Sequence, residues 1–167
     1  MSTKIQPPIA QSEASIEFDA KFINIASLSG HRLYRVDRQA FDCYLESSVD
    51  AETLGCWLSK ALVASKTYEL AEIGNFFDRD VVKAYHDKWA TDMIQRYGYK
   101  SRRALFKSLM HCSCVKRGGT IEIMPTQKGP GESWVGIGDS GAHVFLPESC
   151  TVQELGEGLR LAMSRCI

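Results

Sequence analysis

The chain has 167 residues, of which 44% are hydrophobic and 24% are charged, and its 20 Lys and Arg balance its 20 Asp and Glu. A chain of this length suits one domain with a full core, so it needs no disulfide or metal merely to fold. Zero net charge argues against a general binder of nucleic acid, because affinity for phosphate comes from many Lys and Arg acting together. A local basic patch is still compatible with it.

The first residues, MSTKIQPPIAQSEAS, predict a disordered lead over residues 1–15. They lack the apolar stretch of a secretory signal peptide, and no later run approaches the ~18 apolar residues of a membrane span. We therefore expect a cytoplasmic protein whose six cysteines stay reduced. Residues 16–167 are expected to form a single domain.

Strand patterns and two helices are predicted in the first hundred residues. EFDAKFINIASL alternates apolar and polar side chains, and AFDCYLES repeats the pattern. Asp50 is a good N-cap for a first helix, and Asp78 for a second one that stops at Gly98. The core-facing stripes of the two helices are, respectively, Leu54, Trp57, Leu58, Ala61 and Leu62, and Val82, Tyr85, Trp89, Met93 and Tyr97.

The basic stretch RRALFKSLMHCSCVKRGG, residues 102–119, is expected to be largely a strand. A short helical turn near Ser101 is possible, but the residues after it are poor helix formers. Phe106, Met110, Cys112 and Cys114 then share one face at period two. A Gly-Gly turn leads into TIEIMP, which predicts a hairpin.

The last part is predicted to be a Gly-rich loop around Trp134, a strand HVFLP and a closing helix. Thr151 and Glu154 form a capping box for that helix. Gly55 and Gly156 occupy matching places in two similar helices, where they are expected to permit close helix–sheet approach. The fold class is α/β (α+β), with one central, largely antiparallel sheet of about five strands flanked by about three helices.

Two short motifs in the Gly-rich loop are interpreted as coincidences. GIGDSG (136–141) has the spacing of a dinucleotide-binding turn, but a strand pattern follows it instead of the required helix. GDSGA (138–142) resembles the nucleophile segment of trypsin-like proteases, but no matching His segment lies upstream.

A zinc site is the third alternative. His111, Cys112 and Cys114 could combine with His143, Cys150 or Cys166, but only one tight pair of ligands is present. On a strand the two cysteines share one face and the histidine points the other way, so buried thiols and a surface histidine are the preferred interpretation. We expect no cofactor, although the possibility that Cys112 and Cys114 bind a metal stays open.

The basic residues between positions 96 and 117 are interleaved with aromatics, which favours a small nucleic-acid-binding module as the alternative function. No paired catalytic carboxylates or nucleophile with a base can be picked out. The sequence therefore predicts a binding protein and not an enzyme.

Three stretches resemble the immunity proteins of bacterial contact-dependent growth inhibition, the CdiI type. They are LGCWLSKALVASK (54–66), RYGYKSRRALFKSLMHCSC (96–114) leading into GGTIEIMPTQK, and VQELGEGLRLAMSRC (152–166) preceded by DSGAHVFLPES. The Pro-bearing lead and QKGPGES depart from the family pattern. These departures affect loops, and so partner specificity more than the fold.

The resemblance implies a cytosolic protein that binds and neutralises the cognate C-terminal toxin domain of a large surface protein. Many such toxins are nucleases, and the immunity proteins are not known as enzymes. It also implies an α/β fold with no membrane partner and no direct nucleic-acid partner.

Charge and aromatic character suggest where a toxin would bind. The candidate surfaces are a sheet edge, either 105–115 or 141–146, and the loop with Trp134. The candidate contact residues are Arg102, Arg103, Lys107, Trp134, Asp139 and His143. An acidic surface of Glu69, Glu72, Asp78 and Asp80 is the alternative, and the sequence does not choose between the two.

Overall fold

The computed structural model describes residues 9–167. Within this range the chain forms seven strands, four α-helices and two 3-10 helices. In chain order they are β1 (Ser12–Phe18), β2 (Ile23–Gly30), β3 (Tyr34–Leu45), α1 (Ala51–Ala64), η1 (Leu70–Glu72), α2 (Arg79–Tyr97), α3 (Arg102–Ser108), β4 (Met110–Arg117), β5 (Thr120–Lys128), β6 (Trp134–Gly136), η2 (Ser140–Ala142), β7 (Val144–Pro147) and α4 (Val152–Ser164).

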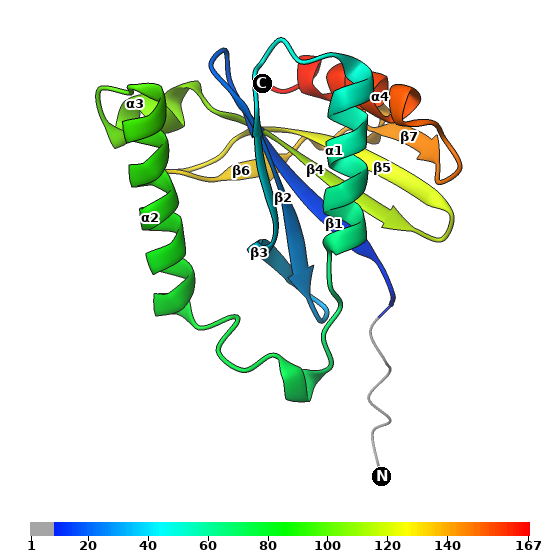
Figure 1. The fold of residues 1–167 in the computed structure, drawn as a ribbon, viewed down its shortest axis with the longest axis horizontal. Helices are drawn as coiled ribbons and strands as arrows, with labels where there is room; N and C mark the ends of the chain where they lie inside the picture. Colours follow the sequence, from blue (N-terminus) through cyan, green and yellow to red (C-terminus); the bar gives the residue numbers. More distant parts are fainter. Residues whose placement is uncertain (1–8) are drawn as a thin grey trace.

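The strands form one sheet in the order β3-β2-β1-β4-β5-β6, and β7 also pairs with β5. All strand pairs within it are antiparallel. The prediction of a largely antiparallel sheet flanked by helices is therefore confirmed, with more strands and one more α-helix than expected. Figure 1 shows α1 and α4 lying together, with α2 and α3 apart from them.

The main core lies between the sheet and the pair α1 and α4. Alternate residues of β1 point into it, namely Ala14, Ile16 and Phe18, together with Cys112 and Cys114 of β4. The predicted stripe of α1 is confirmed, because Leu54, Leu58, Ala61 and Leu62 are buried there and Trp57 packs against it.

Gly55 and Gly156 permit a close approach, but of helix to helix and not of helix to sheet as expected. A Cβ at Gly55 would lie 1.8 Å from the Val152 carbonyl oxygen, and one at Gly156 would lie 1.7 Å from that of Ala51. Each glycine therefore faces the backbone of the other helix. The similar sequences of α1 and α4 thus reflect one helix–helix contact, to which each helix contributes a glycine.

The opposite face of the sheet is polar and partly covered by α2 and α3. These helices build a smaller core of their own with the turn after β1. Its buried residues are Phe22, Trp89, Ala90, Met93, Leu105, Phe106 and Leu109. The C-terminal half of the predicted α2 stripe is buried there or packs against it, whereas Tyr85 at its start is 46% exposed.

Helix ends follow the predicted capping signals. Asp50 accepts a hydrogen bond from the Thr53 backbone N–H at 2.7 Å, and Thr151 and Glu154 form a capping box. Gly98 ends α2 in the left-handed conformation, with φ of 70°. The Gly118 and Gly119 turn between β4 and β5 also has positive φ at both residues, as a tight hairpin requires.

Three boundary predictions are wrong. Residues 102–108 form a helix and not a strand, because the Ser101 side chain caps it by accepting from the Ala104 N–H, and Phe106 then points into the smaller core. The single expected strand EFDAKFINIASL is a hairpin, because Asp19 accepts hydrogen bonds from the N–H groups of Lys21 and Phe22 and so turns the chain. The disordered lead predicted for residues 1–15 overlaps β1, and its first eight residues lie outside the described range.

Among residues 9–167 we find no helix that combines the length and the apolar character needed to cross a membrane.

Candidate functional site

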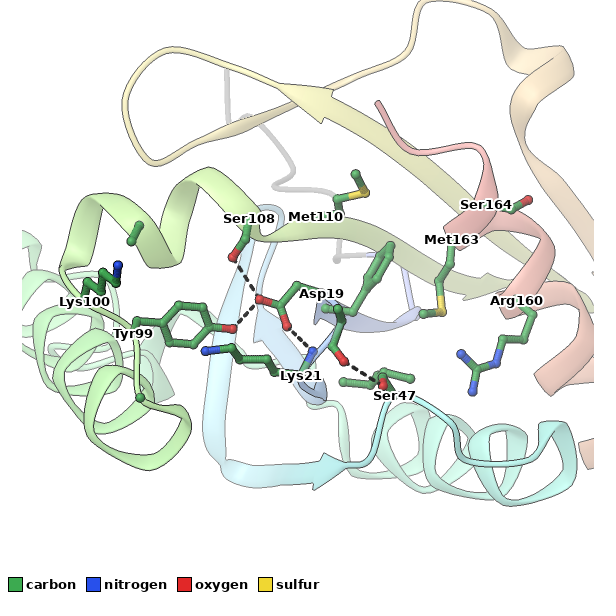
Figure 2. A pocket seen from close by; sticks show the side chains of 15 residues that line it. Asp19, Lys21, Ser47, Tyr99, Lys100, Ser108, Met110, Arg160, Met163 and Ser164 are labelled. Carbon is green, nitrogen blue, oxygen red and sulfur yellow. Dashed lines mark hydrogen bonds between the residues drawn. The ribbon is translucent and has the colours of Figure 1, made fainter.

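An open groove of about 790 Å3 lies at one end of the sheet, between α3 and α4. Figure 2 shows Tyr99, Lys100 and Ser108 on one side of it and Arg160, Met163 and Ser164 on the other. The turn that joins β1 to β2 runs between the two sides. The groove therefore joins the two helical layers of the molecule.

Asp19 organises that turn. Its carboxylate accepts hydrogen bonds from the Ser108 hydroxyl at 2.9 Å, from the Tyr99 hydroxyl, and from the Lys21 backbone N–H at 2.7 Å (Figure 2). Burial, together with the hydrogen bond to Asp19, raises the pKa of Tyr99. Since its carboxylate already has these donors, Asp19 ties α3 to the sheet.

The predicted basic residues of α3 differ in their availability. Arg102 is bound within the molecule, because its guanidinium contacts Glu132 at 2.6 and 2.8 Å and Asp87 at 2.8 Å. These contacts raise its pKa, and Arg102 in turn lowers the pKa of Glu132. Arg103 and Lys107 are exposed and make no ion pair with any residue in the described range. They form the free part of the basic face.

Trp134 is not a loose loop residue, as the sequence suggested, but the first residue of β6, opposite Lys128. Its ring stacks on His111 with centroids 5.3 Å apart and lies 6.3 Å from the Phe106 ring. The indole is half-buried and packs against the smaller core. The histidine at position 111, expected at the surface, is therefore largely covered, and its Nδ1 atom is buried.

Asp139 and His143 lie beside β7 at the far end of the sheet. Asp139 is exposed and caps η2, and His143 contacts Glu122 of β5 at 2.7 Å. Among the strands of residues 9–167, β7 pairs with β5 alone, so its other side has no strand partner there. The prediction that residues 105–115 form a sheet edge is wrong, because β4 lies between β1 and β5.

The acidic residues gather in the segment that leads into α2. Glu69 and Glu72 cap η1, Asp78 caps α2, and all four acids, including Asp80, are exposed.

Beside this segment a cavity of about 330 Å3 opens between β3 and α2. Glu17, a buried acid of β1, lies among its lining residues. Sequence analysis missed Glu17. The signal that could have found it is an acidic residue between Ile16 and Phe18 in a predicted strand.

Within the described range, no group of three His, Cys, Asp or Glu side chains is arranged to hold a metal ion. All six cysteines are free. Cys112 and Cys166 approach each other to 3.4 Å between their Sγ atoms, while Cys114 is fully buried in the main core. The GIGDSG motif runs into η2, a single 3-10 turn, and not into the helix that a dinucleotide site requires.

Comparison with known proteins gives one consistent result. The family of CDI immunity proteins, CdiI, matches residues 12–166. An immunity protein from Yersinia pseudotuberculosis serotype O:3, CdiI-YPIII, is 30% identical over 92% of this chain and 94% of its own.

Solved structures agree in fold along nearly the whole chain. A protein of unknown function from Neisseria meningitidis has a TM-score of 0.89 at 29% identity, covering 97% of this chain and 99% of its own. A chain of a CdiA-CT/CdiI toxin and immunity complex from Yersinia pseudotuberculosis has a TM-score of 0.87 at 28% identity, covering 95% and 99%. The chain thus belongs to the CdiI family of contact-dependent growth inhibition immunity proteins.

Proposed function

We propose that this protein binds the cognate toxin domain of a contact-dependent inhibition system and neutralises it by forming a stoichiometric complex. The observation that carries the proposal is the likeness, at a TM-score of 0.87 over 95% of the chain, to a chain of a solved toxin and immunity complex. The exposed basic and acidic surfaces supply the electrostatic complementarity that speeds and orients such an association.

A nuclease is the toxin class that we propose. Nuclease domains carry basic surfaces where they bind nucleic acid, and the exposed acids of residues 69–80 offer a complementary charge. We further propose that binding takes place in the cytosol, where six free cysteines would remain reduced. The protein acts by occupying the toxin and not by catalysis.

The decisive experiment is co-expression of this chain with the toxin domain encoded next to it. We expect growth to be rescued and a 1:1 complex to co-purify. Nanomolar affinity corresponds to about −12 kcal/mol, which a standard interface can supply. If both proteins are folded and neither rescue nor a complex is seen, toxin binding is excluded; cleavage of RNA or DNA by the isolated toxin tests the nuclease assignment separately.

The basic face has its own test. If Arg103 and Lys107 contact the toxin, changing both to Glu should weaken the complex by about tenfold or more, because like charges then face each other across the interface. Lys60→Glu serves as the control, since Lys60 is an exposed lysine of α1, in the other helical layer of the molecule. Unchanged affinity in the double variant would remove the basic face from the interface.

A further inference from the structure

The cavity between β3 and α2 has two walls. One is the stretch of β3 from Arg35 to Gln39, and the other is formed by Phe76 and the first turns of α2. The pairing of β3 with β2 breaks between Ala26 and Ser27, which leaves residues 38–41 without partners in β2. β3 is therefore irregular where it lines the cavity, at Arg38 and Gln39.

Glu17 is one of two acids that line this cavity, the other being Asp37 of β3. Glu17 lies on β1 in the middle of the sheet and is only 8% exposed. Its Oε2 atom is buried and has no hydrogen-bond partner among residues 9–167. The nearest cation is Arg38, whose Nη2 lies 3.8 Å from Oε1. A buried carboxylate with one unpaired oxygen is costly, and an added donor would relieve that cost.

The two arginines of the cavity are engaged elsewhere. Arg38 donates to Asn24 and to Asp42, the latter at 2.9 Å, and lies over the Trp89 ring at 4.7 Å. Arg35 donates to the Phe76 and Val36 carbonyl oxygens and lies over the Phe76 ring at 3.8 Å. Since each guanidinium has its own acceptors, the 3.8 Å contact with Arg38 is the one ion pair of Glu17 in the described range, and His86 and Lys128 add positive charge nearby.

The walls and rim of the cavity suit the stem and the charge of a basic side chain. Val82 and Tyr85 continue the apolar stripe of α2 into the cavity, and the described fold leaves Tyr85 46% exposed. A long side chain buries its methylene groups against such a surface. The lining residue Phe76 belongs to the segment that carries the exposed acidic residues Glu69, Glu72, Asp78 and Asp80.

We propose that this cavity receives a lysine or arginine side chain of the toxin, and that the cationic end of that side chain pairs with Glu17. The inference rests on the proposed function and identifies which of the two charged surfaces meets the toxin. Arginine is among the residue types enriched in binding hot spots, which lie in well-packed, desolvated pockets.

The protonation behaviour of Glu17 supports this role. Burial raises the pKa of Glu17, and the positive charges of Arg38, His86 and Lys128 oppose that shift only in part. An acid whose pKa is raised on folding stabilises the fold at low pH and loses that contribution as the pH rises through the folded pKa. At neutral pH the free protein is therefore less stable with a charged Glu17 than with a neutral group of the same shape.

The main test is Glu17→Gln, which keeps the shape and removes the charge. We expect the affinity for the cognate toxin domain, measured by calorimetry, to fall by about tenfold or more, while the melting temperature of the free variant stays equal or rises. Glu13→Gln is the matched control, since Glu13 lies on the same strand and sheet face, its pKa is also raised by burial, and it does not line the cavity.

A second measurement needs no toxin. The chain has three tryptophans, of which Trp89 alone lines the cavity. Titration with ethylguanidinium or propylammonium, at constant ionic strength, is expected to shift the indole N–H resonance of Trp89 and to leave those of Trp57 and Trp134 in place. The shift is expected to be lost in Glu17→Gln. Equal shifts of all three indoles, or a Trp89 shift unaffected by Glu17→Gln, would overturn the cation site.

The two proposals fail in different ways. If the wild-type protein forms no complex with the toxin, toxin binding itself is wrong. If it forms a complex whose affinity is the same for wild type, Glu13→Gln and Glu17→Gln, toxin binding stands and the cavity proposal is wrong. A melting temperature of Glu17→Gln well below that of Glu13→Gln would assign Glu17 a structural role instead.

Discussion

His111 places an imidazole on the polar face of the sheet, between β1 and the Trp134 ring. Its Nε2 lies 3.1 Å from the Ser15 hydroxyl, and its Nδ1 is buried without a partner among the described residues. Burial lowers the pKa of His111 from 6.5 to about 4. The folded protein thus holds a neutral ring at a pH where an exposed histidine would be charged.

This shift predicts a pH-dependent loss of stability. Below pH 6.5 the unfolded chain binds a proton at His111 that the folded chain does not bind until about pH 4. The free energy of unfolding should therefore decrease as the pH falls through this range, by about 3 kcal/mol from this residue. In His111→Phe that part of the slope should disappear, as measured by urea unfolding at several pH values. Parallel curves for the two proteins would contradict the prediction.

Cys112 and Cys166 form a pair of thiols ready for oxidation. Their Sγ atoms are 3.4 Å apart, and the hydrogen bond from Cys112 lowers the pKa of Cys166 while raising that of Cys112. A lower thiol pKa increases the fraction of reactive thiolate. Treatment of the folded protein with diamide, which accepts the two hydrogens, should therefore link these two cysteines first. Peptide mass analysis checks this, and Cys166→Ser should give no early disulfide.

At the scale of elements, the crossing of α1 and α4 depends on two glycines. Alanine is a better helix former than glycine by about 1 kcal/mol, so propensity alone predicts that Gly156→Ala is stabilising. The contact predicts the opposite, because the new Cβ would lie 1.7 Å from the Ala51 carbonyl oxygen. That oxygen belongs to the backbone, so no side-chain rotation can relieve the clash.

We therefore expect Gly156→Ala and Gly55→Ala each to lower the free energy of unfolding by about 3 kcal/mol or more. Gly138→Ala is the control, since a Cβ there meets nothing within 4 Å. Chemical denaturation of the three variants provides the measurement. Stabilisation by Gly156→Ala would mean that the two helices do not touch at this point.

The elements that the sequence predicts well are those specified by local signals. Asp50, Asp78, Gly98 and Thr151 mark helix ends by hydrogen bonds to their own neighbours, and each boundary is found as expected. α3 is different, because its helix is held by the Ser101 cap and by burial of Phe106 among residues distant in sequence. β6 has three residues and is defined by its pairing with β5, which no local pattern reveals.

The candidate site is less accessible to sequence analysis than the fold. Arg102 looks like a free cation until its ion pairs with Asp87 and Glu132 are known. Glu17 becomes notable only once the fold buries it beside the irregular part of β3. These side chains acquire their roles from pairs of residues far apart in the chain, and such pairs have no sequence spacing to detect.

At the scale of the whole molecule, the main core closes only when α4 is in place. α4 contributes Leu155, Leu159 and Met163 to the core, and Ile167 exchanges backbone hydrogen bonds with Thr126 and Lys128 at 3.2 and 3.1 Å. Burial of three such side chains is worth roughly 5 kcal/mol, a large share of the 5–15 kcal/mol of a typical domain.

Deletion of residues 152–167 should therefore leave a chain without cooperative thermal unfolding, as measured by calorimetry and by near-ultraviolet circular dichroism. Deletion of residues 165–167 alone should leave a folded protein of lower melting temperature, because the terminal pairing, Cys166 and the hydrogen bond from Arg165 to the Ala142 carbonyl oxygen are lost while α4 keeps its core residues. A cooperative transition in the larger deletion would show that the sheet and α1 form a stable unit by themselves.

This arrangement has a consequence for the timing of protection. Domains generally fold as units while synthesis proceeds from the N-terminus, but here the surface that α4 covers stays open until that helix has been made. We expect a ribosome that stalls before α4 is complete to leave a chain whose main core is not closed. Under the proposed function, a cell whose translation is under attack can rely only on copies completed before the toxin arrived.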